Sequence, residues 1–266
     1  MKWVKLVAVA LTLSLIGCEK SAPESETKHL LVYCGITMIK PMTQLAYEFE
    51  QQFPVAITFS QGGSQDLYDS LKSSQVGDLY LPGSSSYRTN NLADGLLGDY
   101  VHVGYNRIAI MVQKGNPKQL GNEMAQFIDP DIVSVLGNPD TGSVGRATYQ
   151  TLKAAGIAEQ AYDNAVYLTT DSRRLVQGLK EKNFDITLNW YASGTWPGHR
   201  EYVDIIPLSD EFAKPKALQL SYLNLSKEPA MAKAFMQFVA SSRGLQVFKE
   251  YGFLTEAEYQ TALQGH

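Results

Sequence analysis

The chain has 266 residues, a formal net charge of −4, two cysteines and four histidines. Two cysteines are too few for a disulfide framework or a cysteine metal cluster, and no stretch is rich in Lys or Arg, so nucleic acid is not an expected partner. The length is sufficient for a sizeable core in one large lobe or two modest lobes.

The first 17 residues are expected to form a secretory signal. Lys2 and Lys5 precede an apolar run over residues 6–16, which is shorter than the roughly 20 residues that cross a bilayer. The sequence Leu-Ile-Gly-Cys, ending at Cys18, resembles the lipobox of bacterial lipoproteins. That resemblance implies cleavage before Cys18, a lipid on its sulfur and anchoring to a membrane. The alternative is an ordinary secreted protein with an accidental cysteine.

A flexible tether is expected over residues 18–28, because this stretch is polar and contains Pro and Ser. Loss of the signal removes Lys2 and Lys5, so the net charge falls by two, from −4 to −6. Strand and helix patterns then alternate to the end of the chain, which favours an α/β fold.

Apolar and β-branched runs predict strands, and between them apolar residues recur at helical spacing. The helical pattern is clearest at Met42, Leu45, Ala46, Phe49 and Phe53, and again at Ala234, Phe235, Phe238 and Val239. Strands are expected at residues 30–34, 55–59, 78–82, 107–113, 131–137, 165–168, 185–190, 203–208 and 217–223.

Motifs for enzyme chemistry are absent from the sequence. There is no HExxH metal motif, no G-x-S-x-G nucleophile elbow, no GxxxxGK[ST] phosphate loop and no GxGxxG. No nucleophile and base pair can be assembled from the spacing, which disfavours a hydrolase or a transferase. We therefore expect no catalytic residues, no cofactor and no metal site.

Four strand-to-helix corners are rich in small and hydroxyl residues: "YCGITMIKP" (33–41), "SQGGSQD" (60–66), "GNPDTGSVGRATYQ" (137–150) and "TTDSRR" (169–174). A helix N-terminus leaves unpaired backbone N–H groups and carries the positive end of the helix dipole. Glycine allows close approach of the backbone, and Ser or Thr adds a hydroxyl donor. Each corner alone could be an ordinary helix cap, but four in an acidic chain predict an anion site.

The order of these elements resembles that of the molybdate-binding proteins among class II periplasmic solute-binding proteins. The final run "AKAFMQFVASSRGLQVFKEYGF" (232–253) is similar to the C-terminal helices of that family, and "GDLYLPGSSSY" (77–87) matches its aspartate-containing strand. The resemblance implies two α/β lobes, joined by hinge strands, that close on a small oxyanion. It implies that the chain crosses from lobe 1 to lobe 2 near residues 110–116 and returns near residues 205–215. Lobe 1 would comprise residues 29–112 and 209–266, and lobe 2 residues 113–208.

The resemblance also implies a set of ligand-binding residues. Thr37 stands where the relatives usually have serine, and the third corner would donate through its backbone. An arginine in the fourth corner would add a full charge, whereas the other donors are neutral. Trp190 could take the place of the tyrosine that follows it. The implied set is Thr37, Gly63, Ser64, Val144, Gly145, Ser172, Arg173 and Tyr191.

Several alternatives stay open at this stage. The ion could be molybdate, tungstate or a sulfate-like or phosphate-like ion. Cys34 is expected to be a buried inert thiol, against a soft ligand for a thiophilic oxyanion, and Ser84–Ser86 could border the cleft or form a capped loop.

The implied function is that of the substrate-binding component of an ABC importer. We expect a monomer, anchored by its lipid in the cell envelope on the periplasmic or extracellular face of a bacterial membrane, that passes its ion to a membrane permease. Lobe closure on the ligand would be the whole mechanism. The alternative is a sensory protein of the same fold that reports an oxyanion to a membrane histidine kinase.

Overall fold

The computed structural model describes residues 27–264. The expected signal, Cys18 and most of the expected tether lie outside the described residues. The last residue of the expected tether is an exception, because Lys28 already pairs with Val55 and forms an ion pair with Glu228 at 2.8 Å. No helix among the described residues combines the length and the apolar composition that a membrane crossing requires.

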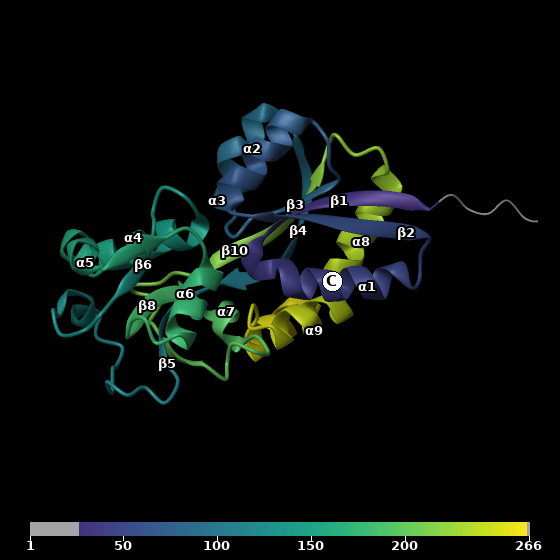
Figure 1. The fold of residues 1–266 in the computed structure, drawn as a ribbon. Coiled ribbons are helices and arrows are strands. Elements are labelled where there is room, and N and C mark those ends of the chain that lie inside the picture. The colour runs from purple at the N-terminus through teal and green to yellow at the C-terminus, as the bar shows by residue number, and fades with distance from the viewer. Residues whose placement is uncertain (1–26, 265–266) are drawn as a thin grey trace, which may run out of the picture.

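The chain folds into two lobes, which lie next to each other in Figure 1. The first lobe contains a five-stranded sheet in the order β2-β1-β3-β10-β4. Three of its strands are parallel, and β10 runs antiparallel to both of its neighbours. The strands are β1 (Lys28–Gly35), β2 (Val55–Gly62), β3 (Leu79–Leu81), β4 (Leu97–Asn106) and β10 (Lys216–Leu223).

Helices cover both faces of this sheet, because successive side chains of a strand point to opposite faces. Val32 and Cys34 belong to the cluster shared with α1, α8 and α9, whereas Tyr33 belongs to a smaller cluster with Leu67 and Tyr87 on the other face. The helices of this lobe are η1 (Ile36–Met38), α1 (Ile39–Glu50), α2 (Ser64–Ser74), α3 (Ser86–Asn91), η2 (Leu92–Asp94), α8 (Pro229–Ala240), α9 (Ser242–Glu250) and α10 (Glu256–Gln264).

The second lobe has its own hydrophobic core, formed by residues between Ile108 and Ala213. An antiparallel sheet in the order β8-β5-β9 and a parallel pair, β6 and β7, carry its helices. Its elements are β5 (Ile108–Gln113), η3 (Met124–Ile128), β6 (Val135–Gly137), α4 (Ser143–Ala154), α5 (Ala158–Asn164), β7 (Tyr167–Thr169), α6 (Ser172–Lys180), β8 (Ile186–Trp190), α7 (Tyr191–Thr195) and β9 (Val203–Pro207).

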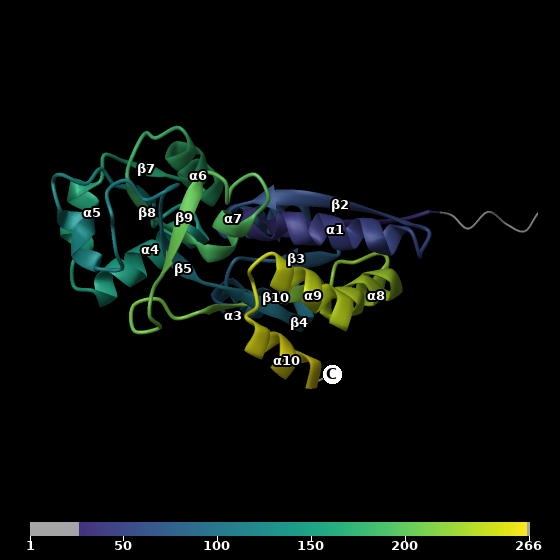
Figure 2. The ribbon, with the colours of Figure 1, turned by 90° about the horizontal axis from the view of Figure 1, so that it is seen from below.

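The chain changes sheet at Arg107, between the end of β4 and the start of β5, and returns between Pro207 and Lys216. Because β5 pairs only with β8 and β9 within the named sheets, we propose the first lobe boundary at Arg107 instead of residue 113. Figure 2 shows α10 on the same side as α8 and α9, where Glu258 forms an ion pair with Arg107.

Every expected strand has a counterpart in the structure, so the prediction of a two-lobed α/β fold is confirmed. Strand β4, which is polar and contains glycine, was not predicted from the sequence. The helical pattern at Phe53 was wrong, since α1 ends at Glu50 and Phe53 lies in the following turn. Its ring still stacks on Phe49, with centroids 4.4 Å apart, which explains why the spacing resembled a continued helix.

Asp78 ties three parts of the first lobe together immediately before β3. Its Oδ2 accepts a hydrogen bond from the Leu31 backbone N–H at 2.8 Å, and its Oδ1 accepts one from the Ser226 hydroxyl at 2.5 Å. The residue is only 6% exposed. Removing a buried acceptor leaves its donors without partners, so this side chain holds β3, and the loop after β3, in place.

We predict that Asp78→Ala lowers the free energy of unfolding by about 2–3 kcal/mol, because the Leu31 N–H and the Ser226 hydroxyl lose a charged acceptor. Asp78→Asn keeps an oxygen for Leu31 and should cost about 1 kcal/mol. Urea unfolding of both variants measures the difference. An alanine variant as stable as the parent would contradict the role of Asp78.

Candidate ligand-binding site

The four hydroxyl-rich corners all lie at the carboxyl ends of parallel strands. In the first lobe Gly35 of β1 pairs with Gly62 of β2, and in the second lobe Gly137 of β6 pairs with Thr169 of β7. Carboxyl ends of parallel strands share one edge of a sheet, and ligands of open α/β sheets bind outside that edge. Each lobe therefore presents two of the corners to the interlobe boundary.

The corners of the two lobes touch one another. A methyl group built on Gly63 would lie 3.2 Å from the Thr141 carbonyl oxygen, and one built on Gly83 would lie 2.5 Å from the Ser143 hydroxyl. A side chain at position 83 would therefore force the Ser143 side chain to shift. Within the second lobe, a methyl group on Gly142 would lie 3.3 Å from the Thr170 oxygen, so the third and fourth corners also adjoin.

Ser64 is held inside this contact and is 1% exposed. Ser64 is the first residue of helix α2 and does not cap it. The N-cap is Gly63, and no side chain caps the helix. The Ser64 hydroxyl oxygen instead accepts the Gly83 backbone N–H at 2.9 Å, while the Tyr80 hydroxyl donates to the Ser64 carbonyl at 2.8 Å. Ser64 thus fixes the loop after β3, and its own hydroxyl hydrogen is still free to donate.

Helices α2 and α4 both begin at the interlobe boundary without a side-chain cap. Their N-cap residues are Gly63 and Gly142, which have no side-chain oxygen to accept from the first turn. The first turn of α4 includes Val144, which is buried, and Gly145. A methyl group on Gly145 would lie 1.8 Å from the Asn138 carbonyl oxygen, so only glycine allows this turn to lie against the end of β6.

Helix α6 differs from these two helices, because it is already capped. Asp171 accepts hydrogen bonds from the backbone N–H groups of Arg173 and Arg174 at 2.9 and 3.1 Å. Both arginine side chains are exposed to solvent. The cap was not recognised from the sequence, although an Asp directly before a predicted helix is a standard N-cap signal.

Two of the expected hydroxyl residues in the first and fourth corners are buried. Thr37 is 3% exposed and Ser172 is 1% exposed. The Ser172 hydroxyl has no hydrogen-bond partner among the described residues, whereas its backbone carbonyl accepts from the Asn189 amide at 2.9 Å. A buried hydroxyl without a partner is unfavourable, so it marks a place where a ligand oxygen could accept a hydrogen bond.

Trp190 and Tyr191 face different cavities. Trp190 lines a cavity of about 360 Å³ together with Ser143, whereas Tyr191 lines another, of about 500 Å³, together with Arg107 and Thr195 near the hinge. Trp190 is the last residue of β8 and Tyr191 is the first residue of α7, so the two side chains lie on either side of a change in secondary structure. Of the two, Trp190 is the one that shares a cavity with the third corner.

The cavity of about 360 Å³ lies between α3 of the first lobe and α4 of the second. It includes Arg146 and Lys216, which were not singled out from the sequence. Their positions in the sequence could have indicated this role, since Arg146 lies inside the third corner and Lys216 begins the strand with which the chain returns to the first lobe. The lining residues are Ser84, Ser85, Ser86, Tyr87, Thr89, Asn90, Ser143, Arg146, Ala147, Gln150, Trp190 and Lys216.

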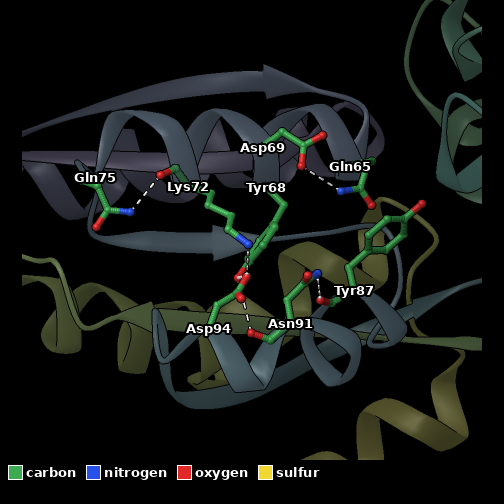
Figure 3. Close-up of polar contacts among 8 residues, drawn as sticks. All are labelled: Gln65, Tyr68, Asp69, Lys72, Gln75, Tyr87, Asn91 and Asp94. Atoms are coloured by element: carbon green, nitrogen blue, oxygen red, sulfur yellow. Dashed lines mark hydrogen bonds and ion pairs between the residues drawn. The ribbon is translucent and has the colours of Figure 1, made fainter.

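A polar cluster holds α3 and the following turn against α2, as Figure 3 shows. The Tyr68 hydroxyl and the Lys72 ammonium both donate to Asp94 Oδ2 at 2.9 Å. Lys72 lowers the pKa of the Asp94 carboxyl, with Tyr68 contributing, whereas burial, supported by Asp94, raises the pKa of the Tyr68 hydroxyl. The Tyr68 hydroxyl also lies 3.3 Å from the Asn91 carbonyl oxygen, at the end of α3, so the cluster positions the cavity-lining helix.

Cys34 is fully buried at the end of β1, in the main cluster of the first lobe. Burial raises the pKa of its thiol, so the sulfur stays protonated and inert at neutral pH. No group of three or more His, Cys, Asp or Glu residues within positions 27–264 is arranged to hold a metal ion.

Two molybdate-binding proteins resemble this chain, one in sequence and one in fold. The molybdate-binding protein ModA of Mycobacterium tuberculosis is 20% identical over 266 residues, which cover 95% of this chain and 99% of the relative. The periplasmic molybdate-binding protein of Azotobacter vinelandii superposes with a TM-score of 0.73 at 15% identity, covering 85% of this chain and 99% of that one.

A third protein, PEB3, is known from Campylobacter jejuni. Its L-phospholactate-bound structure superposes with a TM-score of 0.67 at 13% identity, covering 85% of this chain and 100% of that one. The profile of the family described as "Bacterial extracellular solute-binding protein" matches residues 30–254, well over half of the sequence. The chain therefore belongs to the bacterial extracellular solute-binding proteins, and it has the two-lobed fold expected from its sequence.

Proposed function

We propose that this protein captures a small oxyanion between its two lobes and delivers it to the permease of an ABC importer. The anion would sit at the corners that begin α2, α4 and α6, and the chain would be tethered to the membrane by a lipid on Cys18. Thr37, Ser64 and Ser172 would donate hydrogen bonds to the anion through their hydroxyl groups. The backbone at Gly63, Val144 and Gly145 would come close to the anion. No observation favours the sensory alternative.

One observation carries this proposal: α2 and α4 begin without side-chain caps on opposite sides of the same interlobe contact. Two uncapped N-termini bring two sets of backbone N–H groups and two positive dipole ends to one place. An anion is the ligand that satisfies both. The net charge, −6 once Lys2 and Lys5 are lost with the signal, does not oppose binding, because distant surface charges are screened over about 8–10 Å while the local dipoles are not.

The individual roles of Arg173 and Tyr191 have less support. The Arg173 side chain is exposed, and its backbone N–H already donates to Asp171. Tyr191 lines the hinge cavity, and its backbone N–H donates to the Arg107 carbonyl at 2.7 Å. We therefore propose them only as residues that approach the ligand after lobe movement. The relatives named above bind molybdate or L-phospholactate, so the fold alone does not select the ion.

A thermal-shift panel tests the proposed ligand class. Molybdate, tungstate, sulfate, phosphate, arsenate and chromate should be compared, because a ligand that binds only the folded protein stabilises it by about 2.7 kcal/mol at a hundred times its Kd. We expect one or two of these ions to raise the Tm by several degrees. If sugars or amino acids raise the Tm and no oxyanion does, the proposal is wrong.

Ser172→Ala separates a ligand-binding role from a structural one. Because the Ser172 hydroxyl has no partner among the described residues, its removal should leave the free energy of unfolding of the ligand-free protein within about 0.5 kcal/mol of the parent. The loss of a hydrogen bond to the anion should still weaken binding by about tenfold, as calorimetric titration would measure.

Two further variants complete that test. Ser64→Ala leaves the Gly83 N–H without its acceptor, so it should cost about 1–3 kcal/mol of stability and also weaken binding. Ser134→Ala is the matched control, since its hydroxyl is equally buried and unpartnered among the described residues but lies before β6, at the opposite end from the corner. Parental affinity in Ser172→Ala would remove this residue from the site.

A further inference from the structure

The cavity between α3 and α4 is too large for an inorganic ion alone. Its volume is about 360 Å³, and pockets that enclose organic ligands begin at about 300 Å³. It adjoins the proposed anion site, because Ser143, the first residue of α4, lines it. At the same edge, Ser84 follows Gly83, whose N–H is held by Ser64. A ligand at the corners could therefore extend into this space.

The cavity is cationic although the protein is acidic. Arg146 and Lys216 line it, and none of the Asp or Glu residues within positions 27–264 does. Among residues 27–264, neither cation forms an ion pair with a carboxylate. The Arg146 guanidinium lies over the Tyr87 ring at 4.9 Å, and the Lys216 ammonium donates to the Gln150 amide oxygen at 3.0 Å. Two half-buried cations without an acidic partner favour an anionic occupant.

The remaining wall combines polar groups with one large apolar surface. Tyr87 is 2% exposed, and its hydroxyl has no hydrogen-bond partner among the described residues. In Figure 3 its ring points away from the Asp94 cluster that holds α3 against α2. Ser84 and Asn90 add neutral donors, and Trp190 provides an apolar face. Such a wall suits a small organic body with polar substituents.

We infer that the ligand is a small carboxylic acid that also bears a tetrahedral oxyanion group, with its oxyanion at the corners and its carboxylate facing Arg146 and Lys216. This inference rests on the proposed function, because it takes the anion site at the helix N-termini as given. It narrows the substrate class from bare oxyanions to phosphorylated or sulfonated organic acids. Arginine suits this task, because its planar guanidinium binds a carboxylate through two parallel hydrogen bonds.

Calorimetric titration of the purified mature protein with two matched ligand pairs tests this inference. L-phospholactate is compared with ethyl phosphate, and sulfoacetate with methanesulfonate, so that the members of each pair differ in the carboxylate. We expect the carboxylated member of at least one pair to bind about tenfold tighter or more, the value of one charged hydrogen bond. Equal affinities within both pairs would overturn the inference.

Substitution of the cavity arginine locates the effect. Arg146→Gln should weaken binding of the preferred carboxylated ligand about tenfold more than binding of its uncarboxylated partner, which makes the loss specific to the carboxylate. Arg200→Gln is the control with the same charge change, since Arg200 is exposed and does not line the cavity. An equal loss for both members of the pair, or for both variants, would contradict a carboxylate contact at Arg146.

The same titrations separate the two levels of the account. If phosphate or molybdate binds, and neither carboxylated ligand binds more tightly than its uncarboxylated partner, the inference fails and the proposed function stands. If no inorganic or organic oxyanion binds and a neutral solute does, the proposed function fails and the inference fails with it. Melting temperatures of the ligand-free variants show whether a loss of binding reflects a loss of folding instead.

Discussion

A helix that starts without a cap leaves backbone N–H groups that must find partners, and this constraint organises the boundary between the two lobes. Helices α2 and α4 begin after glycines and meet there, whereas α6 uses Asp171. Side-chain caps on α2 and α4 would satisfy the first backbone N–H groups of these helices within their own lobes. Their absence concentrates donors at the interface, so that the same feature that leaves the helix ends incomplete makes them suitable for an anion.

The surrounding structure keeps these donors in position. Asp78 fixes the start of β3, Ser64 fixes Gly83 just after it, and the Asp94 cluster fixes α3 against α2. The loop after β3 therefore has defined geometry on both sides. Preorganisation of this kind lowers the cost of ordering side chains when a ligand binds. A methyl group built on Gly83 would collide with the Ser143 hydroxyl, so the loop after β3 lies directly against the start of α4.

The sequence carried enough information to predict the two-lobed fold and the corners, but not the cavity. Gly-Gly-Ser between an apolar strand and a helical pattern is a local signal, and it located the start of α2 at Ser64. Arg146 lies on a helix whose polar face is also its interlobe face, and only tertiary contacts reveal which polar residues of α4 meet the other lobe. Lys216 enters the cavity from β10, far away in the chain.

Other differences have equally local causes. Trp190 and Tyr191 are neighbours, so the family resemblance could not decide which ring enters the cleft. In the structure Trp190 ends β8, Tyr191 begins α7, and the two residues line different cavities. Strand β4 was not predicted because glycine and charged residues interrupt its apolar alternation, yet its pairing with β10 along the first sheet overrides this weak propensity.

The most direct test of the account is the location of the ligand in a crystal structure. The protein should be crystallised with whichever anion gives the largest thermal shift, and the ligand located in difference density. The account predicts oxyanion oxygens about 2.7–3.2 Å from backbone nitrogens in the first turns of α2 and α4, between the two lobes. Ligand density confined to the hinge cavity lined by Tyr191, or on the outer surface, would contradict it.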